Sequence, residues 1–168
     1  MPHPLVDQLR FARSEFLRGL EGLSEEDARR RFLPLNCISW NVGHVAWQEQ
    51  TRLLYIGQGI KLFAQLDELC ARGKPASTPS LHQMLDYFSH ITAKVDPWLD
   101  GLSTDDLFTE VVIEKTPSGM LWGTVLMRLT YHYWYHLGEN AAIRQFLGHT
   151  DLPQFVGDID RLAPFREN

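Results

Sequence analysis

The sequence predicts an all-α protein, a four-helix bundle with one long crossover that carries a short extended segment. Four segments repeat apolar residues at intervals of three and four, which is the period of a helix with one buried face. Only residues 107–122 combine the β-branched and turn residues typical of strands. With 168 residues and 44% apolar side chains, the chain is long enough to form one domain, residues 1–168, around a single core.

The first helix is expected over residues 4–20. Its apolar stripe consists of Leu5, Leu9, Ala12, Phe16 and Leu20. A short helix should follow Ser24, because serine caps helix N-termini and acidic residues come directly after it. Pro34 should stop this short helix.

The second long helix is expected over residues 40–55, capped by Ser39 and ended by Gly57. Residues 71–79 are rich in Pro, Gly and small polar residues, which is typical of a linker. Ser80 should then open the third helix. Its apolar positions are Leu81, Met84, Leu85, Phe88, Ile91, Val95 and Trp98.

The extended segment is expected between the third and fourth helices. Val111, Val112 and Ile113 favour a strand, and residues 116–119 (Thr-Pro-Ser-Gly) favour a turn, so a loose hairpin is predicted. The fourth helix should run over residues 123–147 and end at a glycine. We expect the tail that follows to pack back on the bundle. Phe155 and Phe165 are its candidate contacts.

Charge and composition exclude several classes of protein. The 16 Lys and Arg against 21 Asp and Glu give a net charge of −5, and no long basic run is present, so no nucleic-acid partner is expected. No apolar stretch is long enough to span a membrane, and the N-terminus lacks the pattern of a signal peptide. Cys37 and Cys70 form no C-x-x-C motif, which fits a reducing compartment. A cytoplasmic location is therefore expected.

Two histidines on the fourth helix are the first candidates for a metal site. His132 and His136 are four residues apart, which places their side chains on one helix face with Cβ atoms roughly 6 Å apart. That spacing allows both imidazoles to bind one ion at about 2.0–2.1 Å. The alternative is that one is a hydrogen-bonded core residue and the other is exposed.

A third histidine lies on an inner face of the second helix. Trp40, His44 and Trp47 share that face, and Gly43 allows another helix to approach closely. Three histidine ligands would leave an open coordination position for water or substrate. The alternative for His44 alone is a core histidine bonded to a carbonyl group.

Further residues are candidates for supporting this site. Gln48, Glu139 and Asn140 could orient the imidazoles, and the alternative for each is an ordinary solvated or capping residue. Trp47 and Trp134 are expected to form walls of the pocket. No catalytic residue beyond the candidate metal ligands is predicted.

The order of these motifs resembles the DinB/YfiT-like superfamily. Residues 36–44 (NCISWNVGH) supply the early histidine, residues 131–139 (YHYWYHLGE) the later pair, and residues 148–153 (GHTDLP) resemble the end of DinB-like domains. The resemblance covers nearly the whole chain. It implies a bundle of up-down-down-up topology, homodimers, and a divalent zinc or nickel ion held by His44, His132 and His136.

Some members of this superfamily are metal-dependent enzymes that use a low-molecular-weight thiol. The resemblance therefore implies an S-transferase whose metal activates a thiol, although the residues fit a hydrolase that activates water equally well. Arg52 and Arg128 are candidates for holding the carboxylates of such a thiol. The alternatives are a non-catalytic metal- or ligand-binding module and a purely structural metal. A structural metal is the least attractive, because the core is large enough to fold without one.

Overall fold

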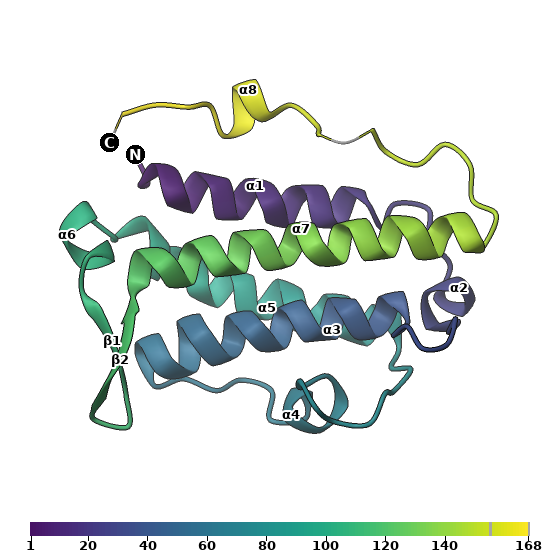
Figure 1. The fold of residues 1–168 in the computed structure, drawn as a ribbon, viewed down its shortest axis with the longest axis horizontal. Helices are drawn as coiled ribbons and strands as arrows, with labels where there is room; N and C mark the ends of the chain where they lie inside the picture. Colours follow the sequence, from purple (N-terminus) through teal and green to yellow (C-terminus); the bar gives the residue numbers. More distant parts are fainter. Residues whose placement is uncertain (155, 168) are drawn as a thin grey trace.

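The computed structural model describes residues 1–154 and 156–167, and its body consists of long helices. Within that part of the chain, four long helices pack together: α1 (Pro4–Arg18), α3 (Ile38–Glu49), α5 (Leu81–Asp100) and α7 (Trp122–Phe146). Figure 1 shows α1 and α7 running in one direction and α3 and α5 in the opposite direction. Helix α1 packs along α7, and α3 packs along α5. The predicted helical class is confirmed.

Short elements connect the long helices. Helix α2 (Glu25–Arg29) precedes α3, and a π-helix, η1 (Gln50–Ile56), continues α3 without a break. The chain between η1 and α5 contains α4 (Leu66–Leu69), and α6 (Thr104–Leu107) follows α5. A last short helix, α8 (Ile159–Leu162), lies in the C-terminal tail beside α1 (Figure 1).

Two of the three N-cap residues predicted from the sequence are confirmed, and the third is wrong. Ser24 accepts a hydrogen bond from the backbone of Asp27, and Ser80 accepts one from Gln83, as N-cap residues do. The second long helix instead begins at Ile38, with Cys37 at the N-cap and without a side-chain cap bond. Ser39 therefore lies inside the first turn rather than at the cap.

The extended segment forms an antiparallel hairpin of β1 (Glu110–Ile113) and β2 (Thr116–Leu121). Its turn lies at Glu114 and Lys115, which have φ angles of 48° and 68°, and not at residues 116–119 as predicted. The hairpin lies in the connection between the antiparallel helices α5 and α7 (Figure 1). The chain that crosses back between the parallel helices α3 and α5 spans residues 57–80 and carries α4, so the extended segment does not belong to that crossover.

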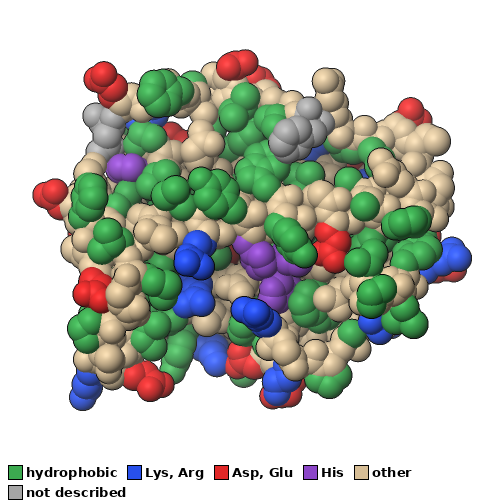
Figure 2. Space-filling view, in the orientation of Figure 1, with side chains coloured by type: hydrophobic (Ala, Val, Ile, Leu, Met, Phe, Trp, Pro, Cys, Tyr) green, Lys and Arg blue, Asp and Glu red, His purple; other side chains and the backbone are tan. Residues whose placement is uncertain are grey.

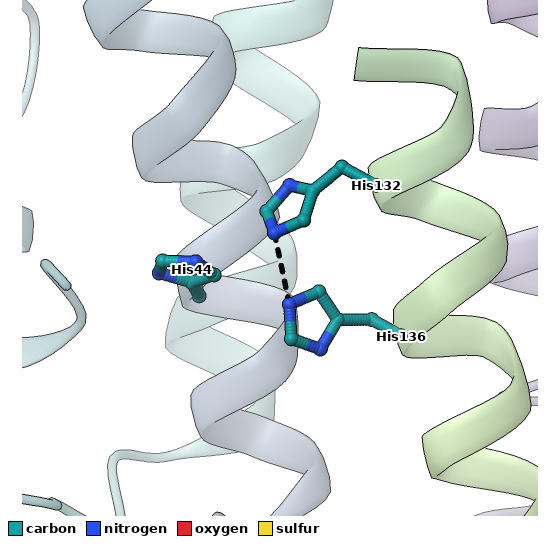
Figure 3. Close-up of side chains that lie close together, drawn as sticks. All are labelled: His44, His132 and His136. Atoms are coloured by element: carbon teal, nitrogen blue, oxygen red, sulfur yellow. Dashed lines mark hydrogen bonds between the residues drawn. The ribbon is translucent and has the colours of Figure 1, made fainter. Parts of the chain in front are cut away.

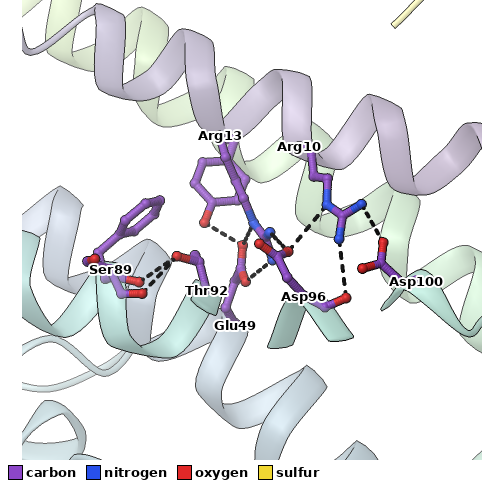
Figure 4. A network of polar contacts seen from close by, with 9 residues as sticks. Arg10, Arg13, Glu49, Ser89, Thr92, Asp96 and Asp100 are labelled. Carbon is purple, nitrogen blue, oxygen red and sulfur yellow. Dashed lines mark hydrogen bonds and ion pairs between the residues drawn. The ribbon is translucent and has the colours of Figure 1, made fainter. Parts of the chain in front are cut away.

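A buried polar network joins the long helices (Figure 4). Arg13 of α1 donates two hydrogen bonds to the Glu49 carboxylate of α3, at 2.6 and 2.5 Å. Tyr133 of α7 donates to the same carboxylate at 2.6 Å, and Asp96 of α5 accepts from Arg13 at 2.7 Å. Burial raises the pKa of Tyr133 well above its ordinary value, and the Glu49 charge acts in the same direction. One residue from each long helix thus fixes the relative positions of the helices.

The C-terminal tail lies against α1 through polar contacts. Gln8 donates a hydrogen bond to the Ala163 carbonyl at 2.8 Å, and Arg166 pairs with Asp7 at 2.6 Å. Phe165 is fully exposed, so the prediction that it packs on the bundle is wrong. The other predicted contact, Phe155, lies outside the described residues. None of the described helices has the length and apolar character needed to cross a membrane.

Candidate metal centre

Three histidines from two helices converge at the contact between α3 and α7. His44 comes from α3, and His132 and His136 come from successive turns of α7 (Figure 3). One ligating nitrogen from each ring lies within 4.8 Å of the other two. His44 and His136 are buried, and His132 is partly exposed. The structure therefore brings together the three residues that the spacing singled out.

The orientation of His44 is fixed by a backbone carbonyl and by aromatic rings. Its Nδ1 lies 2.7 Å from the carbonyl oxygen of Cys70, so Nδ1 carries the hydrogen and Nε2 keeps its lone pair. The rings of Trp40 and Trp47 stack on the imidazole, with centroids 4.6 and 5.5 Å away. Burial lowers the pKa of His44 to about 4, which keeps the ring neutral at neutral pH.

His136 is oriented by a carboxylate one turn further along α7. Its Nδ1 lies 2.8 Å from Oε2 of Glu139, so this nitrogen is also the donor and Nε2 faces the other histidines. The Nε2 atoms of His136 and His132 lie 3.0 Å apart. Two imidazole nitrogens bound to one zinc ion at about 2.0–2.1 Å are themselves roughly 3 Å apart, so the pair is already close to ligating geometry. Burial, together with the neighbouring histidines, lowers the pKa of His132 to about 3.

A second layer of side chains supports Glu139. Asn41 of α3 uses its Nδ2 to donate to Oε2 of Glu139 at 3.1 Å and to Oδ1 of Asn140 at 2.8 Å. The chain of bonds runs from α3 through Asn41 to Glu139 and on to His136. Such outer contacts fix the tautomer and direction of a metal-binding histidine. The side chains predicted to orient the imidazoles therefore include one that contacts a histidine directly, Glu139.

The surface beside the histidines contains two adjoining cavities. The first, the histidine cavity, has a volume of about 580 Å³ and is lined by all three histidines together with Glu139 and Arg72. The second, the arginine cavity, has a volume of about 490 Å³. It is lined by Gln48, Arg52, Arg72, Met120, Val125, Arg128, Leu129, Tyr131, His132 and Tyr135. The cavities share Gln48, Arg72, His132 and Tyr135, so His132 is accessible from both.

The remaining predicted site residues divide into two groups. Trp47 stacks on His44, Gln48 lines both cavities, and Asn140 accepts a hydrogen bond from Asn41. Trp134 is not brought to the site, because its ring packs against Phe11 of α1 with centroids 6.0 Å apart. A residue two positions from His132 on a helix points to nearly the opposite side, which explains why Trp134 faces α1.

The donor set is suitable for a divalent metal ion. Neutral imidazoles are the form that binds metals, and the hydrogen bonds of His44 and His136 leave their Nε2 lone pairs directed toward the shared space. Imidazole ligands suit zinc and nickel. The three histidines could therefore hold one ion.

The family model of the DinB superfamily matches residues 8–139. The chain belongs to the DinB superfamily. A DinB-like protein from Bacillus cereus has a similar solved structure, with a TM-score of 0.65 and 19% identity, and the match covers 90% of this chain and 95% of the other. At this identity the likeness concerns the fold alone. No curated protein shows significant similarity to the chain.

The structure adds site residues of this DinB-family chain that the sequence did not reveal. The Cys70 carbonyl accepts a hydrogen bond from His44, and the Asn41 amide donates one to Glu139. Arg72 borders both cavities. A backbone carbonyl has no sequence signature. Arg72 belongs to a segment that is typical of a linker, so its position beside His132 depends on the folded path of residues 57–80.

Proposed function

We propose that this DinB-family protein is a metal-dependent enzyme that binds one divalent ion, zinc or nickel, through His44, His132 and His136. The observation that carries the proposal is the place of the three histidines in the wall of an open cavity. Structural zinc sites have four protein ligands, whereas catalytic sites have three and leave a position for water or substrate. An S-transferase that activates a low-molecular-weight thiol is the first candidate, and a hydrolase that activates water is the second.

The bound metal would lower the pKa of a coordinated thiol or water molecule and so supply a nucleophile near neutral pH. The protein residues orient the ligands and exclude water from one side of the site. Glu139 accepts a hydrogen bond from Nδ1 of His136, and the Cys70 carbonyl accepts one from Nδ1 of His44. Trp40 and Trp47 cover the faces of the His44 ring and leave its edge toward the other histidines.

Cobalt-substituted protein tests which nucleophile the site takes. A thiolate bound to cobalt gives an intense charge-transfer absorption that nitrogen and oxygen ligands do not give. Glutathione and bacillithiol are suitable probes, and a serine analogue of each is the matched control. We expect one of the thiols to produce the band, with release of a proton on binding. The band should be absent in His132→Ala and present in His82→Ala, which removes an exposed histidine of α5.

The alternatives give different results in the same experiment. If no thiol perturbs the cobalt spectrum, and the spectrum instead changes with pH as a bound water ionises, the hydrolase is favoured over the transferase. If small ligands bind the metal but no substrate is turned over, the protein is a metal- or ligand-binding module.

We also propose that the protein is a cytoplasmic homodimer that acts on a small molecule and not on nucleic acid or membranes. Support for the dimer comes from the family resemblance and from large exposed side chains on α7, among them Met127, Tyr131 and Tyr135. The net charge of −5 argues against a nucleic-acid partner. Light scattering across a dilution series should give twice the chain mass, and a constant monomer mass would refute the dimer.

A further inference from the structure

Three arginines in the arginine cavity have no carboxylate partner. Arg52 lies on η1, Arg72 follows α4, and Arg128 lies on α7, so three separate segments bring them to one hollow. None of their side chains forms a hydrogen bond or an ion pair with another described residue. By contrast, Lys74, which borders the histidine cavity, contacts Glu68 at 2.8 Å. The arginine cavity thus gathers positive charge that the protein itself does not neutralise.

The described lining of the arginine cavity contains no acidic residue. Glu139, the acidic residue of the neighbouring histidine cavity, is already engaged by His136 and Asn41. In Figure 2, basic side chains (blue) lie beside the histidines (purple) at the centre of this face. A hollow lined by charges of one sign concentrates its field and attracts small ions of the opposite sign. This is notable in a chain whose net charge is −5.

The size and the lining of the arginine cavity favour an organic anion as its ligand. Its volume of about 490 Å³ is within the range of small-molecule sites. Met120, Val125 and Leu129 also line the cavity and provide apolar contacts for a carbon skeleton. The planar guanidinium group bonds carboxylate and phosphate groups through paired hydrogen bonds. Three guanidinium groups can together bind a ligand that carries more than one such group.

We propose that the arginine cavity binds a small organic molecule with two or more anionic groups, carboxylates or phosphates, and directs its other end toward His132. Arg52, Arg72 and Arg128 hold the anionic groups, and Tyr131 and Tyr135 form the rim. The assignment of this molecule as substrate or thiol cofactor rests on the proposed function. The binding of an anion in the cavity is independent of the proposed function, because the arginines are separate from the histidine ligands.

Calorimetric titration of metal-free protein tests the proposal without using activity. Tricarballylate supplies carboxylates, pyrophosphate supplies phosphates, and the triamide of tricarballylic acid is the uncharged control. We expect one of the anions to bind with an affinity that falls as salt is added, and the triamide not to bind. The stronger anion identifies the chemical group that the cavity recognises.

Variants locate the binding in the cavity. Arg52→Gln, Arg72→Gln and Arg128→Gln should each weaken the anion by about tenfold, because a charge-assisted hydrogen bond is lost. Arg128→Lys keeps the positive charge but loses the paired N–H donors of the guanidinium group, and it should weaken binding by about threefold or more. Lys94→Gln on α5 removes an exposed charge that does not belong to the cavity lining and should leave the affinity unchanged. Circular dichroism and thermal melting verify that each variant folds.

The outcomes separate this inference from the proposed function. Anion binding by a protein that takes up no metal supports the cavity assignment and contradicts the metalloenzyme. Metal uptake without binding of either anion overturns the cavity assignment and leaves the metalloenzyme intact. The cavity assignment is also overturned if the triple arginine variant binds the anion as tightly as the unaltered protein.

Discussion

The Nε2 atoms of His132 and His136 lie 3.0 Å apart, and the opposite nitrogen of His136 is bonded to Glu139. Because Nδ1 of His136 donates to the carboxylate, its Nε2 presents a lone pair toward His132. A neutral ring has one donor and one acceptor nitrogen, so Glu139 determines which nitrogen of His136 can bind a metal. Glu139 is therefore the residue that we propose positions His136, and Asn41 donates a hydrogen bond to Glu139 from the neighbouring helix.

The first prediction concerns Glu139. Glu139→Gln keeps the size of the side chain but removes the charge that fixes the His136 tautomer, so metal affinity should fall by about 10–100-fold. Competition with a chromophoric chelator measures this affinity. Gln145→Glu, at an exposed position of the same helix, is the control for a change of charge and should have no effect. Unchanged affinity in Glu139→Gln would show that Glu139 does not support the site.

The second prediction concerns the close contact of α3 with its neighbours at Gly43. A Cβ atom there would lie 2.4 Å from the Cys70 sulfur and 2.5 Å from the Met84 sulfur. Gly43→Ala should therefore lower the free energy of unfolding by about 1–3 kcal/mol and move Cys70, whose carbonyl holds His44. Urea unfolding measures the loss of stability.

Gly138→Ala is the matched control for Gly43→Ala. A Cβ at Gly138, on α7, would meet no atom within 4 Å other than those of its own stretch of helix. This substitution should raise the free energy of unfolding by about 0.5–1 kcal/mol, because alanine loses less backbone freedom than glycine in a helix. Equal effects of the two substitutions would contradict the tight packing described at Gly43.

The helices could be predicted because their signals are local. The period of apolar residues located α1, α5 and α7 to within about two residues at each end, which is the usual uncertainty of helix boundaries. The pair His132 and His136 followed from the same period. The π-helix η1, which carries Arg52, could not be predicted, because its hydrogen bonding depends on packing rather than on a sequence motif.

The surroundings of the histidines depended on contacts between distant segments. Glu139 could be proposed because it lies one turn from His136 on the same helix. The contact of Asn41 with Glu139 joins two helices, and the Cys70 carbonyl reaches His44 from a connecting segment, so neither has a local signal. The arginine cavity gathers residues from three segments. Arg52 and Arg128 were candidates on charge alone, and Arg72 was missed.

The third prediction concerns the buried ion pair of Arg13 and Glu49. Both side chains are almost completely buried, so Glu49→Gln leaves the partly exposed Asp96 as the carboxylate that still contacts Arg13. Removing one partner of a buried pair costs about 3–5 kcal/mol. Arg10→Gln breaks only more exposed pairs with Asp96 and Asp100 and should cost less than about 1 kcal/mol. Urea unfolding that ranks the two variants in the reverse order would contradict this account of the network.

The fourth prediction concerns the thiol of Cys70. Burial raises the pKa of Cys70 to about 12, so the thiol stays protonated and shielded at pH 8. Iodoacetamide should leave Cys70 unmodified in the folded protein and alkylate it fully in urea. Mass spectrometry of peptides measures both states. Rapid alkylation in the folded state would mean that the α4 segment opens and that its carbonyl does not hold His44 firmly.

The metal content of purified protein tests the central claim most directly. Protein produced without added metal should contain about one zinc or nickel ion per chain, and His44→Ala, His132→Ala and His136→Ala should each lose it while remaining helical. His82→Ala, which removes an exposed histidine outside the site, should retain the ion. Elemental analysis combined with circular dichroism gives both quantities. A metal content that is the same in the unaltered protein and in all three site variants would contradict the account.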